Sequence, residues 1–353
     1  MIMTPSLSAL VRDHGAVMSG EGGLPLHFGD LRPEVAALES GTGVLDLEAC
    51  GVILLRGPQA AQFLNGLTTN DAVKLAVGAI QPSLISANKG KILFEILLLR
   101  TKAEEFLLLT EPGELEAVAG HLNFYHVREE LEFGQVPLVR LDLIGPGAGE
   151  ALRFDSLSDR DMTGRFSGDP LVTVPVGLGE LNRIIALTTP AAAAGVAQSI
   201  LQNSPGSRLV GLEAFDEVRI RQGVPRMGAD FDRDFLPAEA GLYTHLSFNK
   251  GCYVGQEVHA RMQHRGHPNR KLVALSWPES EPAGEAGAEL FHAGEVAGRM
   301  TSVTRLSHAG RWHAIALVRF ALTHPPTPLS LRAGGEAAVA MRPLATDLGS
   351  RRP

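Results

Sequence analysis

The chain has 353 residues, of which 44% are hydrophobic and 20% charged, and its formal net charge is −7. At roughly 150 residues per domain this length predicts two or three packed units, and the balanced composition excludes a disordered chain and a membrane protein. An acidic chain lacks a general attraction to phosphate backbones and anionic lipids, so we expect no nucleic acid and no membrane as a partner.

Two cysteines, Cys50 and Cys252, are too few for a disulfide framework or for a four-cysteine zinc or iron–sulfur site. The N-terminus carries neither the basic segment nor the apolar stretch of a signal peptide. We therefore expect a reduced, cytoplasmic protein, and we expect it to be a monomer.

An internal repeat organises the first two thirds of the chain. Residues 53–64 (ILLRGPQAAQFL) and 141–152 (LDLIGPGAGEAL) each read as an apolar strand, a Gly-Pro turn and the start of a helix. Glycine lets the chain reverse direction, and proline is tolerated in the first turn of a helix. The repeat predicts two related α+β halves, at about 10–135 and 136–267.

The spacing of apolar residues predicts the elements that follow. We expect strands at 80–86, 91–100, 105–110, 171–176 and 182–187, and helices at 112–127, 190–201, 211–222 and 256–263. From about residue 270 the pattern changes to short apolar stretches separated by Gly, Pro and His, which predicts a small all-β barrel or sandwich at 268–345. Residues 346–353 are expected to be a frayed tail.

The segment around Cys252 (NKGCYVGQEVHARMQHRG) is the most informative one for chemistry. Gly251 and Gly255 bracket the cysteine, which favours a loop tip with an exposed thiol. Lys250 and the start of a helix at Gln256 would make such a thiol easier to ionise. The alternative is an inert, buried cysteine.

Three histidines, His259, His264 and His267, follow Cys252 and could in principle join it around a metal ion. Their spacing matches none of the usual zinc patterns, so we expect no metal site. Three alternating aspartates at 230, 232 and 234 suggest a cation loop, but they lack the later Gly and Glu of an EF-hand, which favours a solvated turn.

Another polar cluster combines Asn70 and Asp71 with Lys89. Gly90 and Lys91 follow Lys89, so two of the six lysines of the chain lie here. A solvated hairpin turn explains them about equally well.

Several strings together resemble a known family. K-G-C-Y-V-G-Q-E at Lys250–Glu257, preceded by R-I-x-x-G-V-P at Arg219–Pro225 and L-P-x-E-x-G-L at Leu236–Leu242, resembles the YgfZ-type folate-binding proteins of iron–sulfur cluster assembly and repair. The strings HGAVM, GVLDL, GPQAAQFLNGLTTND, ANKGK and GEVAGRMTS look like the same superfamily, which includes the glycine-cleavage T-protein aminomethyltransferases.

The resemblance implies an α+β fold in which two ferredoxin-like halves and a helical connection surround a central folate pocket, with a C-terminal β-barrel. It implies that Cys252 is the functional thiol and that Lys250 holds tetrahydrofolate, or a one-carbon derivative, through its charge. The other residues that it places at the cofactor are Tyr253, Gln256, Glu257, Asn70, Asp71, Lys89 and Arg219.

Two departures bear on the reaction. Where the aminomethyltransferases carry an acidic residue after G-G-I-L, this chain has Phe94, and the neighbouring Glu95 lies on the other face of a strand. Where those enzymes carry a pteridine-binding Glu in R-L-E-x-G, this chain has Arg221. Both departures argue against aminomethyl transfer.

We therefore expect a tetrahydrofolate-binding accessory protein, rather than an enzyme, that serves iron–sulfur client or assembly proteins through Cys252. The first alternative is a folate-dependent aminomethyl or one-carbon transferase that uses a different acid, such as Glu95 or Asp71. The second alternative is a binding scaffold in which both cysteines are inert.

Overall fold

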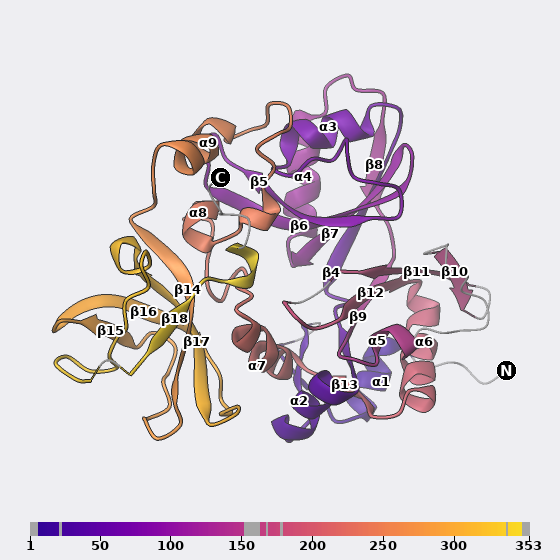
Figure 1. Ribbon diagram of the computed structural model, residues 1–353. Coiled ribbons are helices and arrows are strands. Elements are labelled where there is room, and N and C mark those ends of the chain that lie inside the picture. The colour runs from indigo at the N-terminus through magenta and orange to yellow at the C-terminus, as the bar shows by residue number, and fades with distance from the viewer. Residues whose placement is uncertain are drawn as a thin grey trace. The chain divides into compact units, whose positions relative to one another are not determined.

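The computed structural model describes residues 6–20, 23–151, 163–166, 169–176, 179–336 and 338–347 (Figure 1). The chain forms two compact units, each assembled from separate stretches of sequence. The first unit is Met1–Leu64, Ala72–Pro82 and Ile96–Phe215, and the second is Asn65–Asp71, Ser83–Glu95 and Asp216–Pro353.

The first α+β half is built on a five-stranded antiparallel sheet with the order β5-β6-β7-β4-β8. Its strands are β4 (Cys50–Arg56), β5 (Ile80–Ser86), β6 (Ile92–Lys102), β7 (Glu105–Pro112) and β8 (Glu132–Gln135), and its helices are α3 (Ala60–Leu67) and α4 (Leu115–Tyr125). In the first part of β6, buried and half-buried residues alternate, because successive side chains of a strand point to opposite faces.

A second sheet is six-stranded, with the order β10-β11-β12-β9-β3-β13, and is antiparallel except for the parallel pair β13 and β3; its strand β3 comes from within the range 10–135 predicted for the first half. Its strands are β3 (Thr42–Asp46), β9 (Val139–Ile144), β10 (Thr163–Phe166), β11 (Asp169–Pro175), β12 (Arg183–Thr188) and β13 (Ser207–Val210). The helices of this part are α1 (Leu7–Asp13), α2 (Leu31–Ser40), α5 (Ala148–Ala151) and α6 (Pro190–Asn203), and a short ribbon pairs β1 (Val17–Met18) with β2 (Pro25–His27).

Among the described residues, apolar side chains of this first unit pack in clusters, two of which involve its sheets. One cluster packs α1 and the alanine-rich α6 on the six-stranded sheet, through residues such as Val11 and Ile200. The other joins the two sheets face to face, with Val52 and Leu109 from one and Ile185 from the other. Burial of these apolar surfaces is the main favourable term for the unit.

The internal repeat is confirmed as strand, turn and helix in both copies. Gly57 and Gly145 both have positive φ, +143° and +126°, and a Cβ on either would lie within 2.6 Å of a backbone oxygen. Both prolines stand in the turn before the helix rather than in its first turn. The end of the second copy, residue 152, lies outside the described residues.

The C-terminal sheet has the order β15-β16-β17-β14-β18, in which the edge strands β15 and β18 do not pair with each other, and the predicted β-barrel stays a prediction. Its strands are β14 (Arg270–Pro278), β15 (Glu289–His292), β16 (Glu295–Val303), β17 (Arg311–Arg319) and β18 (Ala340–Arg342). Isolated bridges join Phe291 of β15 to Ser330, and Leu329 to Val339, the residue before β18.

Both faces of this sheet are covered by apolar residues. One face packs on a cluster that includes Ile220 from α7 (Leu212–Gln222) and Phe235, and the other is buried around Trp277. Residues 216–267 thus belong to the same compact unit as the sheet. A domain boundary near Pro268, between the folate-binding region and the C-terminal strands, stays a prediction. Of the predicted tail, Asp347 is buried in the turn Ala345–Asp347 and pairs with Lys271, and 348–353 lie outside the described residues.

The remaining predicted helices and strands are found close to their expected positions, including α9 (Gln256–His264) after Cys252. Two short helical turns, α8 (Pro237–Ala240) and η1 (Tyr243–His245), precede α9. Within the described residues, no helix is both long and apolar enough to cross a membrane.

Candidate functional site

The Cys252 segment is a loop that leads into α9. Cys252 is exposed, as the glycine bracket predicts, and it forms no disulfide. Gly255, the residue before α9, has φ +85°, and a Cβ there would lie 2.7 Å from the carbonyl oxygen of Ala87. Only glycine fits this conformation and this close approach, so Gly255 fixes the angle at which the loop enters the helix.

Lys250 is held entirely by groups of the protein. Its Nζ donates hydrogen bonds to the carbonyl oxygens of Asn65 (2.7 Å), Thr68 (2.6 Å) and Asn70 (2.9 Å). The ammonium also lies 4.8 Å from the centroid of the Tyr253 ring, a cation–π contact. Burial lowers the pKa of Lys250 to about 8 while Asp71 opposes that shift, so the amine is protonated at neutral pH.

Tyr253 and His259 link the Cys252 loop to the turn between β5 and β6. The Tyr253 hydroxyl is 3.1 Å from Nδ1 of His259, and Nε2 of His259 is 2.8 Å from the carbonyl oxygen of Gly90. His259 is buried, and burial lowers its pKa, although the Gly90 carbonyl opposes this. This histidine therefore acts as an internal support, with both ring nitrogens in contact with the protein.

The other predicted residues of this segment lie in the first turn of α9. Gln256 is half-buried, and its N–H donates to the carbonyl of Tyr253 (3.2 Å). Glu257 is exposed and forms an ion pair with Arg261 (2.8 Å), a pairing at i, i+4 that stabilises a helix only slightly. Gln256 remains close to the loop, whereas Glu257 faces solvent.

Asn70 and Asp71 lie near Lys250, because the segment 65–71 lies beside the Cys252 loop, and their contact with a cofactor stays a prediction. The side-chain amide of Asn70 donates to the carbonyl of Thr244 (3.2 Å), and its side-chain oxygen accepts from the N–H of Asp71 (3.0 Å). Lys89 is exposed in the turn between β5 and β6, next to Gly90.

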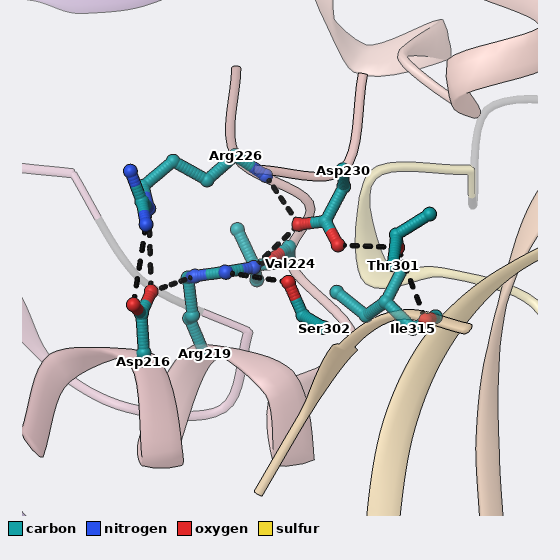
Figure 2. A network of polar contacts seen from close by, with 8 residues as sticks. All are labelled: Asp216, Arg219, Val224, Arg226, Asp230, Thr301, Ser302 and Ile315. Carbon is teal, nitrogen blue, oxygen red and sulfur yellow. Dashed lines mark hydrogen bonds and ion pairs between the residues drawn. The ribbon is translucent and has the colours of Figure 1, made fainter. Parts of the chain in front are cut away.

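Arg219 lies in a separate buried network, shown in Figure 2. Its side chain is 1% exposed and donates to the carboxylates of Asp216 and Asp230 and to Ser302 Oγ (3.0 Å). Asp230 also accepts from the N–H of Arg226 (3.0 Å) and from Thr301 Oγ1 (2.6 Å). These partners give Arg219 a structural role, and its contact with a cofactor stays a prediction.

The same network corrects the interpretation of the three aspartates as one solvated turn. Asp230 is buried and is a central acceptor, whereas Asp232 and Asp234 are exposed. Asp232 accepts from the N–H of Asp234, which in turn pairs with Lys91 (2.8 Å). Alternation in the sequence gives no signal for this difference, because only the packing against β16 separates Asp230 from the others.

Two acidic residues have partners in the protein interior; Glu95 was named from the sequence as a possible acid, and Glu217 was not. Glu95 lies on the opposite face of β6 from the buried Phe94, and its Oε1 is 3.2 Å from Nε2 of His245. Glu217 on α7 is buried and accepts from the N–H groups of Arg305 and Leu306, and burial raises its pKa. In the sequence, Glu217 stands four positions before Arg221 in a predicted helix, which places both residues on one helix face. This spacing is the one pattern that could have drawn attention to Glu217.

One buried hydroxyl beside the Cys252 loop lacks a partner. Ser86 is 1% exposed, its Oγ has no hydrogen-bond partner among the described residues, and its Cβ would lie 3.2 Å from a Cβ on Gly255. An unpaired buried hydroxyl is costly and suits a polar ligand or a water molecule. Within the same described part of the chain, no three His, Cys, Asp or Glu side chains are placed to hold a metal ion.

Comparison with known proteins gives consistent results. Residues 7–164 match the family described as the GCVT N-terminal domain. The chain is 28% identical to an aminomethyltransferase of Streptomyces avermitilis over 346 residues, covering 91% of each chain, and 26% identical to an aminomethyltransferase of Geobacillus sp., covering 95% of this chain and 96% of the relative.

The fold is also that of a solved structure. The crystal structure of glycine cleavage system aminomethyltransferase T from Bartonella henselae superposes with a TM-score of 0.82 and 23% identity, covering 96% of each chain. At that identity the likeness concerns the fold alone.

Proposed function

Because these matches support the superfamily of the glycine-cleavage T-protein, we propose that the chain binds tetrahydrofolate and acts in folate-dependent one-carbon chemistry. The observation that carries the proposal is the similarity to aminomethyltransferases over nine tenths of both chains. The donor set beside the Cys252 loop fits such a ligand: the buried Ser86 hydroxyl and the amide of Gln256 suit the polar edge of a pteridine.

Of the two uses of folate that the sequence suggests, the relatives favour aminomethyl transfer over support of iron–sulfur proteins. The reported relatives are named aminomethyltransferase, and none of them is named for iron–sulfur assembly. The motifs favoured the accessory role over the transferase, and the relatives favour the transferase over the accessory role. A bound tetrahydrofolate would supply the nitrogen atoms that accept the one-carbon unit.

Glu95 and His245 are the best candidates for the proton-transfer groups of a transferase. A carboxylate 3.2 Å from an imidazole nitrogen can orient the ring. At the two positions where the aminomethyltransferases carry an acidic residue, this chain has Phe94 and Arg221, so neither position supplies a carboxylate. We therefore assign proton transfer to Glu95 together with His245.

The first experiment is a calorimetric titration of tetrahydrofolate into the purified protein, for which we expect one site per chain. The second follows aminomethyl transfer from a protein-bound donor to tetrahydrofolate, comparing the wild type with Glu95→Gln. A positioned acid or base contributes roughly 100-fold or more, so the variant should lose that much of the rate while it still binds folate. Absence of binding in the wild type would refute the proposal.

A second candidate function is a folate-binding accessory role in iron–sulfur assembly or repair. It is favoured by the exposed thiol of Cys252 inside the K-G-C-Y-V-G-Q-E string and by the side chains of Phe94 and Arg221. In a strain that lacks the gene, Cys252→Ala should fail to restore the activity of iron–sulfur enzymes, and Cys50→Ala should restore it. Equal rescue by both variants would exclude this role for the thiol.

A further inference from the structure

Three backbone carbonyls from a distant part of the chain converge on one nitrogen atom. Asn65, Thr68 and Asn70 each place a carbonyl oxygen between 2.6 and 2.9 Å from Nζ of Lys250. An ammonium group has three N–H donors and no acceptor, so these three oxygens use all of its donors. No N–H of Lys250 is left over to hold the carboxylate of a folate.

The carbonyls lie where a helix ends. α3 ends at Leu67, and the last carbonyls of a helix have no partner within it and carry partial negative charge. Lys250 Nζ bonds the carbonyl of Asn65, and the N–H of Val254 donates to that of Gly66 (3.4 Å). The Cys252 loop therefore supplies partners to the C-terminal end of α3.

Further hydrogen bonds tie the segment 65–71 to the residues before the loop. Thr69 Oγ1 donates to the carbonyl of His245 (2.7 Å), and the N–H of Ser247 donates to the carbonyl of Thr69 (3.0 Å). Lys250 is a charged donor, whereas the hydroxyl of Thr69 and the N–H of Ser247 are neutral. Hydrogen bonds that involve a charged group are about twice as strong as neutral ones, so Lys250 contributes most per contact.

We propose that the carbonyls of Asn65, Thr68 and Asn70 form an ammonium cradle, and that Lys250 is a positioning residue that fills it and thereby fixes the Cys252 loop on the segment 65–71. The functional meaning of that placement rests on the folate-dependent role proposed above, but the cradle itself does not. This assignment differs from the role of folate contact that the sequence resemblance implies for Lys250.

Chemical rescue tests the cradle directly. Lys250→Ala removes the amine and leaves the three carbonyls, so a free ammonium ion can occupy the vacated position. We expect amide hydrogen exchange in 65–71 and 249–255 to accelerate by roughly tenfold or more in the variant. Ammonium chloride on the order of 100 mM should reverse most of that change.

The controls separate the cradle from a general effect of charge or salt. Sodium chloride and tetramethylammonium chloride, at the same concentration, should not rescue the variant, because neither cation has an N–H to donate. Lys102→Ala, which removes a lysine whose side chain is 74% exposed, should leave the exchange of both segments unchanged. Unchanged exchange in Lys250→Ala, or equal rescue by the three salts, would overturn the proposal.

If Lys250→Ala folds poorly, thermal unfolding of Lys250→Ser provides the same comparison. Its midpoint should rise in ammonium above the value in sodium, and equal midpoints would also overturn the proposal. Folate binding is measured separately with tetrahydrofolate and with an analogue that lacks the glutamate. The cradle predicts that loss of Lys250 weakens both ligands by the same factor, whereas direct contact with the glutamate weakens only the first.

Discussion

Replacing Arg219 by methionine is expected to lower the free energy of unfolding by about 3–5 kcal/mol, the usual cost of removing one partner of a buried ion pair. Methionine keeps most of the apolar stem, so the change isolates the guanidinium. Asp230 would retain the Arg226 N–H and the Thr301 hydroxyl but would lose its one buried cationic partner in Figure 2. Ser302 Oγ and the Val224 carbonyl would lose a donor as well.

Urea unfolding followed by tryptophan fluorescence measures this loss, because Trp277 and Trp312 both belong to the C-terminal sheet. Arg319→Met is the matched control, since Arg319 is 48% exposed and lies 3.4 Å from the exposed Glu295. Exposed pairs contribute at most about 1 kcal/mol. A loss for Arg219→Met no larger than that of the control would refute the reasoning.

The remaining predictions concern the thiols, one glycine and one carboxyl group. A small alkylating agent at neutral pH should label Cys252 and spare Cys50 until the protein unfolds, because burial raises the pKa of Cys50 to about 12; native labelling of Cys50, read by peptide mass, would contradict this. Gly255→Ala should cost roughly 1–3 kcal/mol by urea unfolding, whereas Gly251→Ala, whose Cβ meets nothing closer than 3.8 Å, should be nearly neutral. Burial raises the pKa of Asp46 to about 6, so between its ordinary value of 3.8 and that pH the native state binds more protons than the unfolded state. The free energy of unfolding should therefore fall as the pH rises through this window, and thermal scans of Asp46→Asn should show a smaller fall.

The secondary structure followed from the sequence because it depends on local spacing. β5 spans residues 80–86 as the apolar pattern predicts, and the Gly-Pro repeat marks the same strand and turn in both halves. The exposure of Cys252 was also predictable, since the glycines beside it restrict the conformations of the loop. In each case the determining residues lie within a few positions of one another.

Contacts between distant segments were decided only by the tertiary structure. The sequence singled out Lys250 but assigned it to a ligand, because its three acceptors are backbone carbonyls 180 to 185 positions away and a carbonyl has no signature in the sequence. The burial of Asp230 likewise depends on contacts between distant segments. Whether a charged group meets solvent or a partner, and whether two edge strands meet, depends on how the elements pack, which the local pattern of residues does not encode.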